Sequence, residues 1–171
     1  QAAEPAKEAN YMRLKKLKTI VKVMFVCHGN ICRSPMAEFV LKDMVKKLGR
    51  ADEFLIASSA TSTEETGNPV HRGTVKKLAE VNISTAGKYA VQLKKSDYDK
   101  YDYFLGMDSR NVANMNYILG ADPDNKIHKL LTFANRSDDI ADPWYTGNFD
   151  ETYEDVVEGC EGFLKFLENQ R

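Results

Sequence analysis

The amino-acid sequence predicts an α/β fold in which a single domain is built on a four-stranded parallel sheet with helices on both faces. The first observation behind this prediction is an alternation of short β-rich runs with longer helical patterns, starting at Ile20. The second is the length, because 171 residues is the size of one domain. The third is the composition: 43% hydrophobic and 29% charged residues are typical of a globular protein, which excludes disordered, collagen-like and membrane-embedded classes.

The first strand and the first helix are predicted between residues 20 and 48. Residues 20–26 form a nearly continuous apolar run, of the kind that is buried in a parallel sheet. Pro35 begins the helix at a position where its missing N–H costs nothing. Apolar residues then recur at helical spacing as far as Leu48, and Gly49 is the expected stop.

The remaining elements continue the same alternation. Parallel strands joined by helices need right-handed crossovers, which place the helices on both faces of the sheet. We expect a strand over 54–57, a loop over 61–69, a helix over 71–82, a strand over 101–107, a helix through 112–119, a strand over 127–133, a long loop over 134–149 and a final helix through 153–167.

The N-terminus, the charge and the cysteines narrow the class of protein. Residues 1–18 are expected to be an N-terminal extension outside the fold, which leaves residues 19–171 as the folded domain. A formal net charge of −1 does not point to nucleic acid or to an anionic membrane as a partner. Three cysteines are an odd number and do not make a disulfide scaffold, so we expect a reducing, cytoplasmic setting.

The segment between the first strand and the first helix gathers residues that suit phosphate chemistry. It reads VCHGNICRSP over residues 26–35, at the sheet edge where open α/β folds bind ligands. So short a loop can aim the backbone N–H groups of residues 28–33 inward as an anion nest. Arg33 adds a planar fork of donors for a tetrahedral oxyanion. Cys27 faces this nest and the helix dipole, and at comparable sites the cysteine pKa falls from about 8.5 to roughly 3.5–7.5.

The Cys-x5-Arg-Ser spacing lets Cys27 and Arg33 address the same phosphorus atom. Ser34 can donate a hydrogen bond to the Cys27 sulfur, both when it attacks and when it later leaves. Gly29 and Asn30 are the residue types that best tolerate left-handed backbone, and an Asn side chain can also pin neighbouring segments. The combination predicts a nucleophile beside an oxyanion cradle, rather than a plain strand-to-helix turn with a buried cysteine.

Phosphate-ester cleavage also needs an acid that protonates the leaving oxygen, and Asp142 is the best candidate. The proline after it restricts Asp142 to extended backbone, which limits the direction of the carboxylate. Its loop follows the fourth strand and therefore emerges at the same sheet edge as Cys27. Trp144 and Tyr145 would form an apolar wall for a flat aromatic ring, unless they are core aromatics. Asp138 and Asp139 compete for the role but lack the proline.

Residues 26–38 resemble the active-site segment of the low-molecular-weight protein tyrosine phosphatases. The match includes the Asp-Pro-aromatic sequence at 142–144, the Met-Asp-x-x-Asn stretch at 107–111 and the order of elements over 20–170. The resemblance implies a Rossmann-like, phosphotyrosine phosphatase I-like fold. It also implies metal-independent hydrolysis of phosphotyrosine monoesters through a phosphocysteine intermediate, without a cofactor. The implied substrate is a phosphotyrosine-containing protein or a small aryl phosphate.

The resemblance also assigns roles to individual residues. It implies Cys27 as the nucleophile, Arg33 and the backbone of residues 28–33 as phosphate ligands, and Asp142 as general acid and then base. Asn30 and Ser34 would stabilise the loop. The residues expected to bind the substrate are His28, Gly29, Asn30, Ile31, Cys32, Ser34, Trp144 and Tyr145.

Two segments depart from the family pattern. Residues 59–62 read Ser-Ala-Thr-Ser where the family has Ser-Ala-Gly-Thr. Residues 87–91 read Gly-Lys-Tyr-Ala-Val where the family has Gly-His-x-Ala-Arg. Both lie outside the catalytic loop, so they bear on partner and substrate preference rather than on the chemistry.

The other cysteines and the histidines have simpler interpretations. Cys32 either forms a reversible disulfide with Cys27 that shields the thiolate, as in similar phosphatases, or is a small packed thiol. Cys160 lies on the apolar stripe of the final helix and is expected in the core. His28, His71 and His128 share no metal-ligand spacing, so we expect no metal site; His71 is either on the rim of the pocket or on a surface loop.

Three functions other than phosphotyrosine hydrolysis are compatible with parts of this pattern. An arsenate reductase on this fold relays a disulfide through two further cysteines, and none occurs between Cys32 and Cys160. Phosphoarginine specificity tends to accompany Thr in similar enzymes, where this chain has Ile31. A non-catalytic phosphopeptide-binding module would not need Cys27 and Asp142 together.

For the oligomeric state, we expect a monomer or weak dimer.

Overall fold

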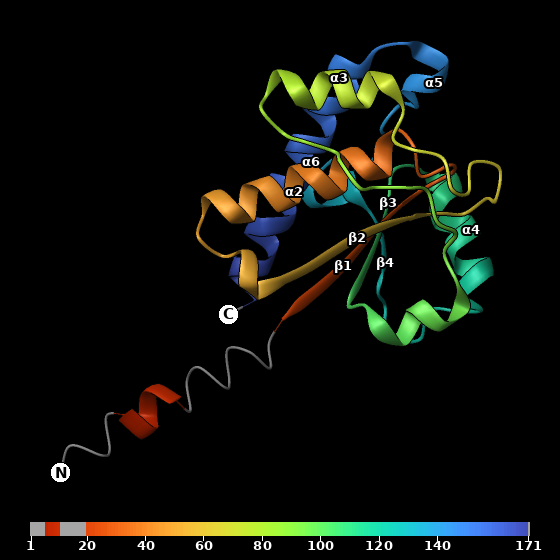
Figure 1. The fold of residues 1–171 in the computed structure, drawn as a ribbon. Helices are drawn as coiled ribbons and strands as arrows, with labels where there is room; N and C mark the ends of the chain where they lie inside the picture. The colour runs from red at the N-terminus through yellow and green to blue at the C-terminus, as the bar shows by residue number, and fades with distance from the viewer. Residues whose placement is uncertain (1–5, 11–19, 171) are drawn as a thin grey trace.

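Four parallel strands, in the spatial order β2-β1-β3-β4, form the centre of the computed structural model (Figure 1). The strands are β1 Val21–Cys27, β2 Phe54–Ala60, β3 Tyr103–Gly106 and β4 Ile127–Lys129. This confirms the predicted α/β fold. The structure describes residues 6–10, which form a short exposed helix, and residues 20–170. The rest of the expected extension over residues 1–18 lies outside the described residues.

Helices cover both faces of the sheet, with α2 and α6 on one face and α4 on the other (Figure 1). The α-helices are α2 Arg33–Lys47, α3 Arg72–Glu80, α4 Ser109–Leu119, α5 Pro143–Thr146 and α6 Phe149–Asn169. Short 3₁₀ helices are η1 Ala51–Glu53, η2 Lys95–Lys100 and η3 Leu130–Ala134. Within residues 6–10 and 20–170, no helix is both long enough and apolar enough to cross a membrane.

The inner strand β1 is apolar from Val23 to Cys27, because its side chains there alternate between two hydrophobic clusters. Val23 and Phe25 belong to the cluster that contains residues of α2 and α6. Met24 and Val26 belong to the opposite cluster, with Met115 of α4. Burying a side chain of this size contributes about 1.5–3 kcal/mol, so the continuous apolar run at the start of the domain stabilises both layers.

The fourth strand is shorter than the sequence pattern indicated. The expected strand over 127–133 was wrong beyond Lys129, where the chain turns into η3. Leu130 and Leu131 are both fully buried in one cluster, and consecutive residues of a strand would point to opposite faces. The tight 3₁₀ turn brings both into the core, where Leu130 packs against Gly159 of α6.

Other bounds also differ from the prediction; the strand expected over 101–107, for example, is shorter and spans Tyr103–Gly106. β2 continues past residue 57 because its pairing with β1 extends to the register of Cys27 with Ala60. α2 begins at Arg33, so that Pro35 is its third residue and still lies in the first turn, where backbone N–H groups have no partner within the helix. The loop expected over 134–149 contains α5.

The carboxyl edge of the sheet gathers the loops that carry the predicted site residues. β1 ends at Cys27, directly before the loop that leads into α2. β3 ends shortly before Asp108, the N-cap residue of α4. The Ile140 N–H donates to the Met107 carbonyl at 2.9 Å, which holds the segment before α5 at the same edge. Asp142 therefore lies beside the loop after β1.

Candidate active site

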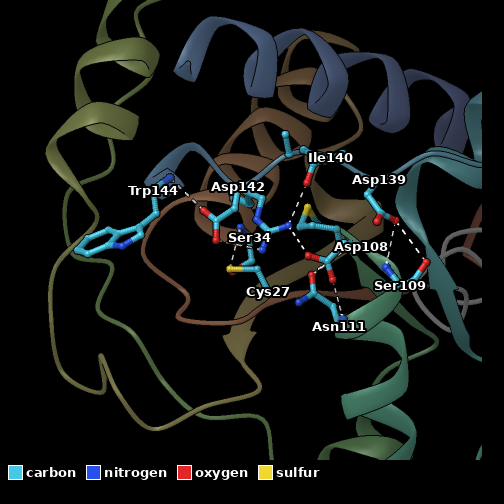
Figure 2. A network of polar contacts seen from close by, with 12 residues as sticks. Cys27, Ser34, Asp108, Ser109, Asn111, Asp139, Ile140, Asp142 and Trp144 are labelled. Carbon is cyan, nitrogen blue, oxygen red and sulfur yellow. Dashed lines mark hydrogen bonds and ion pairs between the residues drawn. The ribbon is translucent and has the colours of Figure 1, made fainter. Parts of the chain in front are cut away.

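A pocket of about 140 Å³ opens at this edge, and Cys27 lies on its wall. The Cys27 Sγ atom is 3.0 Å from the Ser34 hydroxyl (Figure 2). The sulfur also accepts the backbone N–H groups of Asn30 at 3.3 Å and Ser34 at 3.4 Å. The hydrogen bond expected between Ser34 and Cys27 is therefore present. Two backbone N–H groups thus donate to the buried sulfur, and the Ser34 hydroxyl lies within hydrogen-bond distance of it.

Asn30 holds the loop in shape. Its Nδ2 atom donates to the hydroxyls of Ser34 at 2.8 Å and Ser58 at 2.9 Å, and its Oδ1 atom accepts the Val91 N–H at 3.1 Å. Its backbone is left-handed, with φ of 58°. Gly29 does not adopt that conformation, and a Cβ there would lie 3.3 Å from Glu65 Cγ.

The buried carboxylate of Glu38 lies behind this loop, a contact that the sequence pattern did not reveal. Ser58 donates to Glu38 Oε1 at 2.5 Å. Lys88 donates to the Ser58 carbonyl at 2.8 Å and lies 3.6 Å from the same carboxylate oxygen. Burial lowers the pKa of Lys88, and Glu38 only partly opposes this. The available signal was Glu38 itself, a carboxylate on the buried face of a helix.

Arg33 is fixed by oxygen atoms from two other loops. Its Nη1 donates to Asp108 Oδ2 at 2.7 Å and to the Ile140 carbonyl at 3.0 Å, and its Nη2 lies 3.4 Å from Asp142 Oδ2. Burial lowers the pKa of Arg33, but the charges of Cys27 and of the two carboxylates outweigh burial and raise it. The guanidinium therefore stays charged at the wall of the pocket.

Asp108 is a second residue that the sequence analysis did not assign a role. It caps α4 by accepting the Asn111 N–H at 2.7 Å (Figure 2). Asn111 Oδ1 in turn accepts the N–H of Met107 at 3.0 Å. The available signal was an Asp three residues before an Asn at the start of a helix, a pattern that is typical of a capping box.

Asp142 lies on the wall of the same pocket as Cys27. It is the N-cap of α5, and its Oδ1 accepts the Trp144 N–H at 3.1 Å. Its backbone is extended, as the following proline predicted. The competing carboxylates are engaged elsewhere: Asp138 is paired with Arg136, and Asp139 accepts hydrogen bonds from Ser109 and Lys129. Neither lines the pocket.

The two aromatic residues after Asp142 line the pocket and are not core residues. The exposed fractions are 58% for Trp144 and 85% for Tyr145. The Trp144 and His71 rings form a T-shaped pair at a centroid distance of 5.7 Å, and His71 stacks on Phe149 at 5.3 Å. His71 therefore does not line this pocket itself, but it contacts Trp144, which does.

The remaining predicted residues divide between pocket and core. His28, Gly29, Ile31 and Cys32 line the pocket. Burial, followed by the charge of Cys27, raises the pKa of Cys32 to about 12, so that it remains a thiol at neutral pH. Cys160 is fully buried in the core, as expected.

The chain matches the family model described as low molecular weight phosphotyrosine protein phosphatase over residues 22–171. The low molecular weight protein-tyrosine-phosphatase YfkJ of Bacillus subtilis is 36% identical over 154 residues, 89% of this chain and 99% of that protein. The crystal structure of YfkJ superposes with a TM-score of 0.84 and covers 89% of this chain and 97% of its own.

Two further solved structures are similar. SP-PTP, a low molecular weight protein tyrosine phosphatase from Streptococcus pyogenes, has 43% identity and a TM-score of 0.78, covering 86% of this chain and 93% of its own. The drosophila arginine phosphatase DARP has 27% identity and a TM-score of 0.78, covering 86% and 98%.

Proposed function

This chain belongs to the low molecular weight phosphotyrosine protein phosphatases, a family of cysteine-dependent hydrolases, and we propose that Cys27 is its nucleophile, Arg33 its main phosphate ligand and Asp142 its general acid and base. The observation that carries the assignment is that Cys27 and Asp142 line one pocket, with Arg33 hydrogen-bonded to Asp142 between them. Nucleophile, anion site and acid are the three parts that cleavage of a phosphate monoester needs.

The first step transfers the phosphoryl group to the enzyme. The Cys27 thiolate attacks phosphorus and forms the S–P bond while the bond from phosphorus to the phenolic oxygen breaks. The carboxyl group of Asp142 donates its proton to the departing oxygen, so the product leaves as a neutral phenol. Arg33 and the backbone N–H groups of residues 28–33 stabilise the charge on the phosphoryl oxygens.

The second step releases inorganic phosphate. The Asp142 carboxylate accepts a proton from a water molecule as that water attacks the phosphocysteine. The S–P bond breaks, and the electron pair returns to the Cys27 sulfur. Ser34, 3.0 Å away, then stabilises the thiolate as the leaving group. No cofactor is needed in either step.

The walls of the pocket support an aryl substrate. Ile31 and the exposed rings of Trp144 and Tyr145 present apolar surface to the leaving group, which suits a phenol better than the charged guanidine of phosphoarginine. We propose a phosphotyrosine-containing protein as the substrate and a monomer or weak dimer as the active form. A reducing compartment such as the cytoplasm suits a nucleophile that must stay a thiolate.

The test is a comparison of substrates under one condition. The protein is assayed in EDTA with phosphotyrosine, phosphoserine and phosphoarginine peptides, and with arsenate plus a thiol reductant. We expect turnover of phosphotyrosine to exceed that of the other three by a wide margin. Preferred turnover of phosphoarginine or arsenate would contradict the substrate assignment, and loss of phosphotyrosine turnover in EDTA would contradict the metal-independent mechanism.

A further inference from the structure

A second hollow adjoins the catalytic pocket. It is a groove of about 660 Å³ that runs along α3, and its lining includes Ile31, Glu65 and Trp144. The same three residues also line the catalytic pocket. A polypeptide that places a phosphotyrosine against Cys27 therefore has the groove directly beside it.

The groove offers apolar contact surface. Val70 and Val75 contribute to its lining together with Trp144. Val75 is 40% exposed and Trp144 is 58% exposed, so both side chains keep apolar surface that a ligand can cover. His71 contacts Trp144 in a T-shaped arrangement, and an apolar side chain that lies against Val75 and Trp144 would bury apolar surface of both residues.

The groove also carries positive charge. Arg72 and Lys76 line it, and neither forms an ion pair with any residue of the ranges 6–10 and 20–170. Lys77, the next residue of the helix, is by contrast paired with Glu80 at 3.2 Å and Asp150 at 2.8 Å. Glu65, which accepts a hydrogen bond from the neutral amide of Asn68 at 2.6 Å, also lines the groove, so two basic side chains face one acidic side chain there.

We propose that this groove binds the part of the substrate polypeptide next to the phosphotyrosine, with an apolar side chain against Val75 and Trp144 and an acidic side chain against Arg72 and Lys76. The enzyme then prefers phosphotyrosine that is flanked by an apolar and an acidic residue. The inference rests on the proposed function, because the groove is a subsite only if a phosphotyrosine occupies the catalytic pocket.

The first measurement compares phosphotyrosine peptides that carry a Leu-Glu, Leu-Lys or Ser-Ser pair, placed either before or after the phosphotyrosine. For at least one placement we expect the KM of the Leu-Glu peptide to be about three- to tenfold lower than that of the Leu-Lys peptide, and the difference to shrink in high salt. The Ser-Ser peptide should lie between them or above both. Equal KM values for all peptides in both placements overturn the proposal.

The second measurement exchanges the charges. In the double variant Arg72→Glu with Lys76→Glu, the preference should reverse, so that the Leu-Lys peptide has the lower KM. Turnover of p-nitrophenyl phosphate, which is too small to reach the groove, should be unchanged. The control is Lys46→Glu with Lys165→Glu, an equal change of net charge at exposed positions in the last turn of α2 and the C-terminal half of α6; it should keep the wild-type preference.

The outcomes separate the subsite from the chemistry. A variant that keeps p-nitrophenyl phosphate turnover and keeps the wild-type peptide preference contradicts the groove alone. Reversal in the control as well would show that the preference follows net charge and not Arg72 and Lys76, and this too overturns the proposal. A wild-type protein that hydrolyses neither p-nitrophenyl phosphate nor any phosphotyrosine peptide contradicts the proposed function itself.

Discussion

At the scale of single residues, the role of a side chain in the site depends on the residues that it contacts. Asn30 could be anticipated as a loop anchor, because its type and position in the loop suggested it. Lys88 could not, since its role depends on Glu38 and Ser58, which come from distant parts of the chain. Arg33 was predicted as a phosphate ligand. Its hydrogen bonds to the oxygen atoms of Asp108 and Ile140 could not be predicted from the sequence around it. The residue types of this site can be recognised in the sequence, but these contacts of Lys88 and Arg33 with distant segments could not be predicted from it.

The role of Asp142 as the general acid can be tested by comparing two leaving groups. A tyrosine phenol has a pKa of about 10, so its departure needs a proton, whereas the more acidic nitrophenol needs less help. Asp142→Asn should therefore slow phosphoenzyme formation from phosphotyrosine by about 10²–10⁴-fold and from p-nitrophenyl phosphate much less. The measurement is the pre-steady-state rate with each substrate. Equal slowing would show that Asp142 does not donate this proton, and Asp139→Asn, outside the pocket, is the control.

Cys32 is testable by oxidation. A sulfenic acid on Cys27 can condense with the Cys32 thiol, which forms a disulfide and releases water. Mild peroxide should then inactivate the wild type reversibly, with activity restored by dithiothreitol, while Cys32→Ser should recover much less. Cys160→Ala, which removes a thiol from the core, should recover as the wild type does. The same recovery in all three proteins would mean that Cys32 only packs.

At the scale of elements, the sequence indicated which segments are helical and which are extended, because β1 and α6 carry strong apolar patterns. It misjudged the end of β4, since Leu130 and Leu131 fit the composition of a strand. The strand ends because of a tertiary contact, in which α6 packs closely over η3 at Gly159 and Gly162. A pattern read along one segment contains no information about the helix that will cover it.

Gly162→Ala tests that close packing. In an open helix, replacing Gly by Ala stabilises by about 1 kcal/mol. Here the new Cβ would lie 2.6 Å from the Phe133 carbonyl carbon and would also meet its oxygen. Backbone cannot move aside as a flexible side chain can, so the variant should be destabilised by about 1–3 kcal/mol. The measurement is denaturant unfolding, with the exposed neighbour Glu161→Ala as control; a stabilised Gly162→Ala would contradict the packing.

At the scale of the whole molecule, the fold brings chemistry from separate segments to one edge of a parallel sheet. Crossover connections return every strand in the same direction, so the loops after β1, β3 and β4 meet at their carboxyl ends. This topology follows from the order of elements, and for that reason the sequence predicted that Asp142 would lie near Cys27. The groove along α3 was not predicted, because it depends on how α3 and the segment with Trp144 pack beside each other.

The most direct test of the account is to trap the covalent intermediate. The protein is denatured rapidly during turnover of a phosphotyrosine peptide with labelled phosphate, and the label is located by peptide mapping. We expect phosphocysteine at Cys27 in the wild type and more of it, relative to turnover, in Asp142→Asn with a nitrophenol leaving group. Cys27→Ser should bind inorganic phosphate but carry no label. Label on any other residue, or a burst of phenol without label at Cys27, would contradict it.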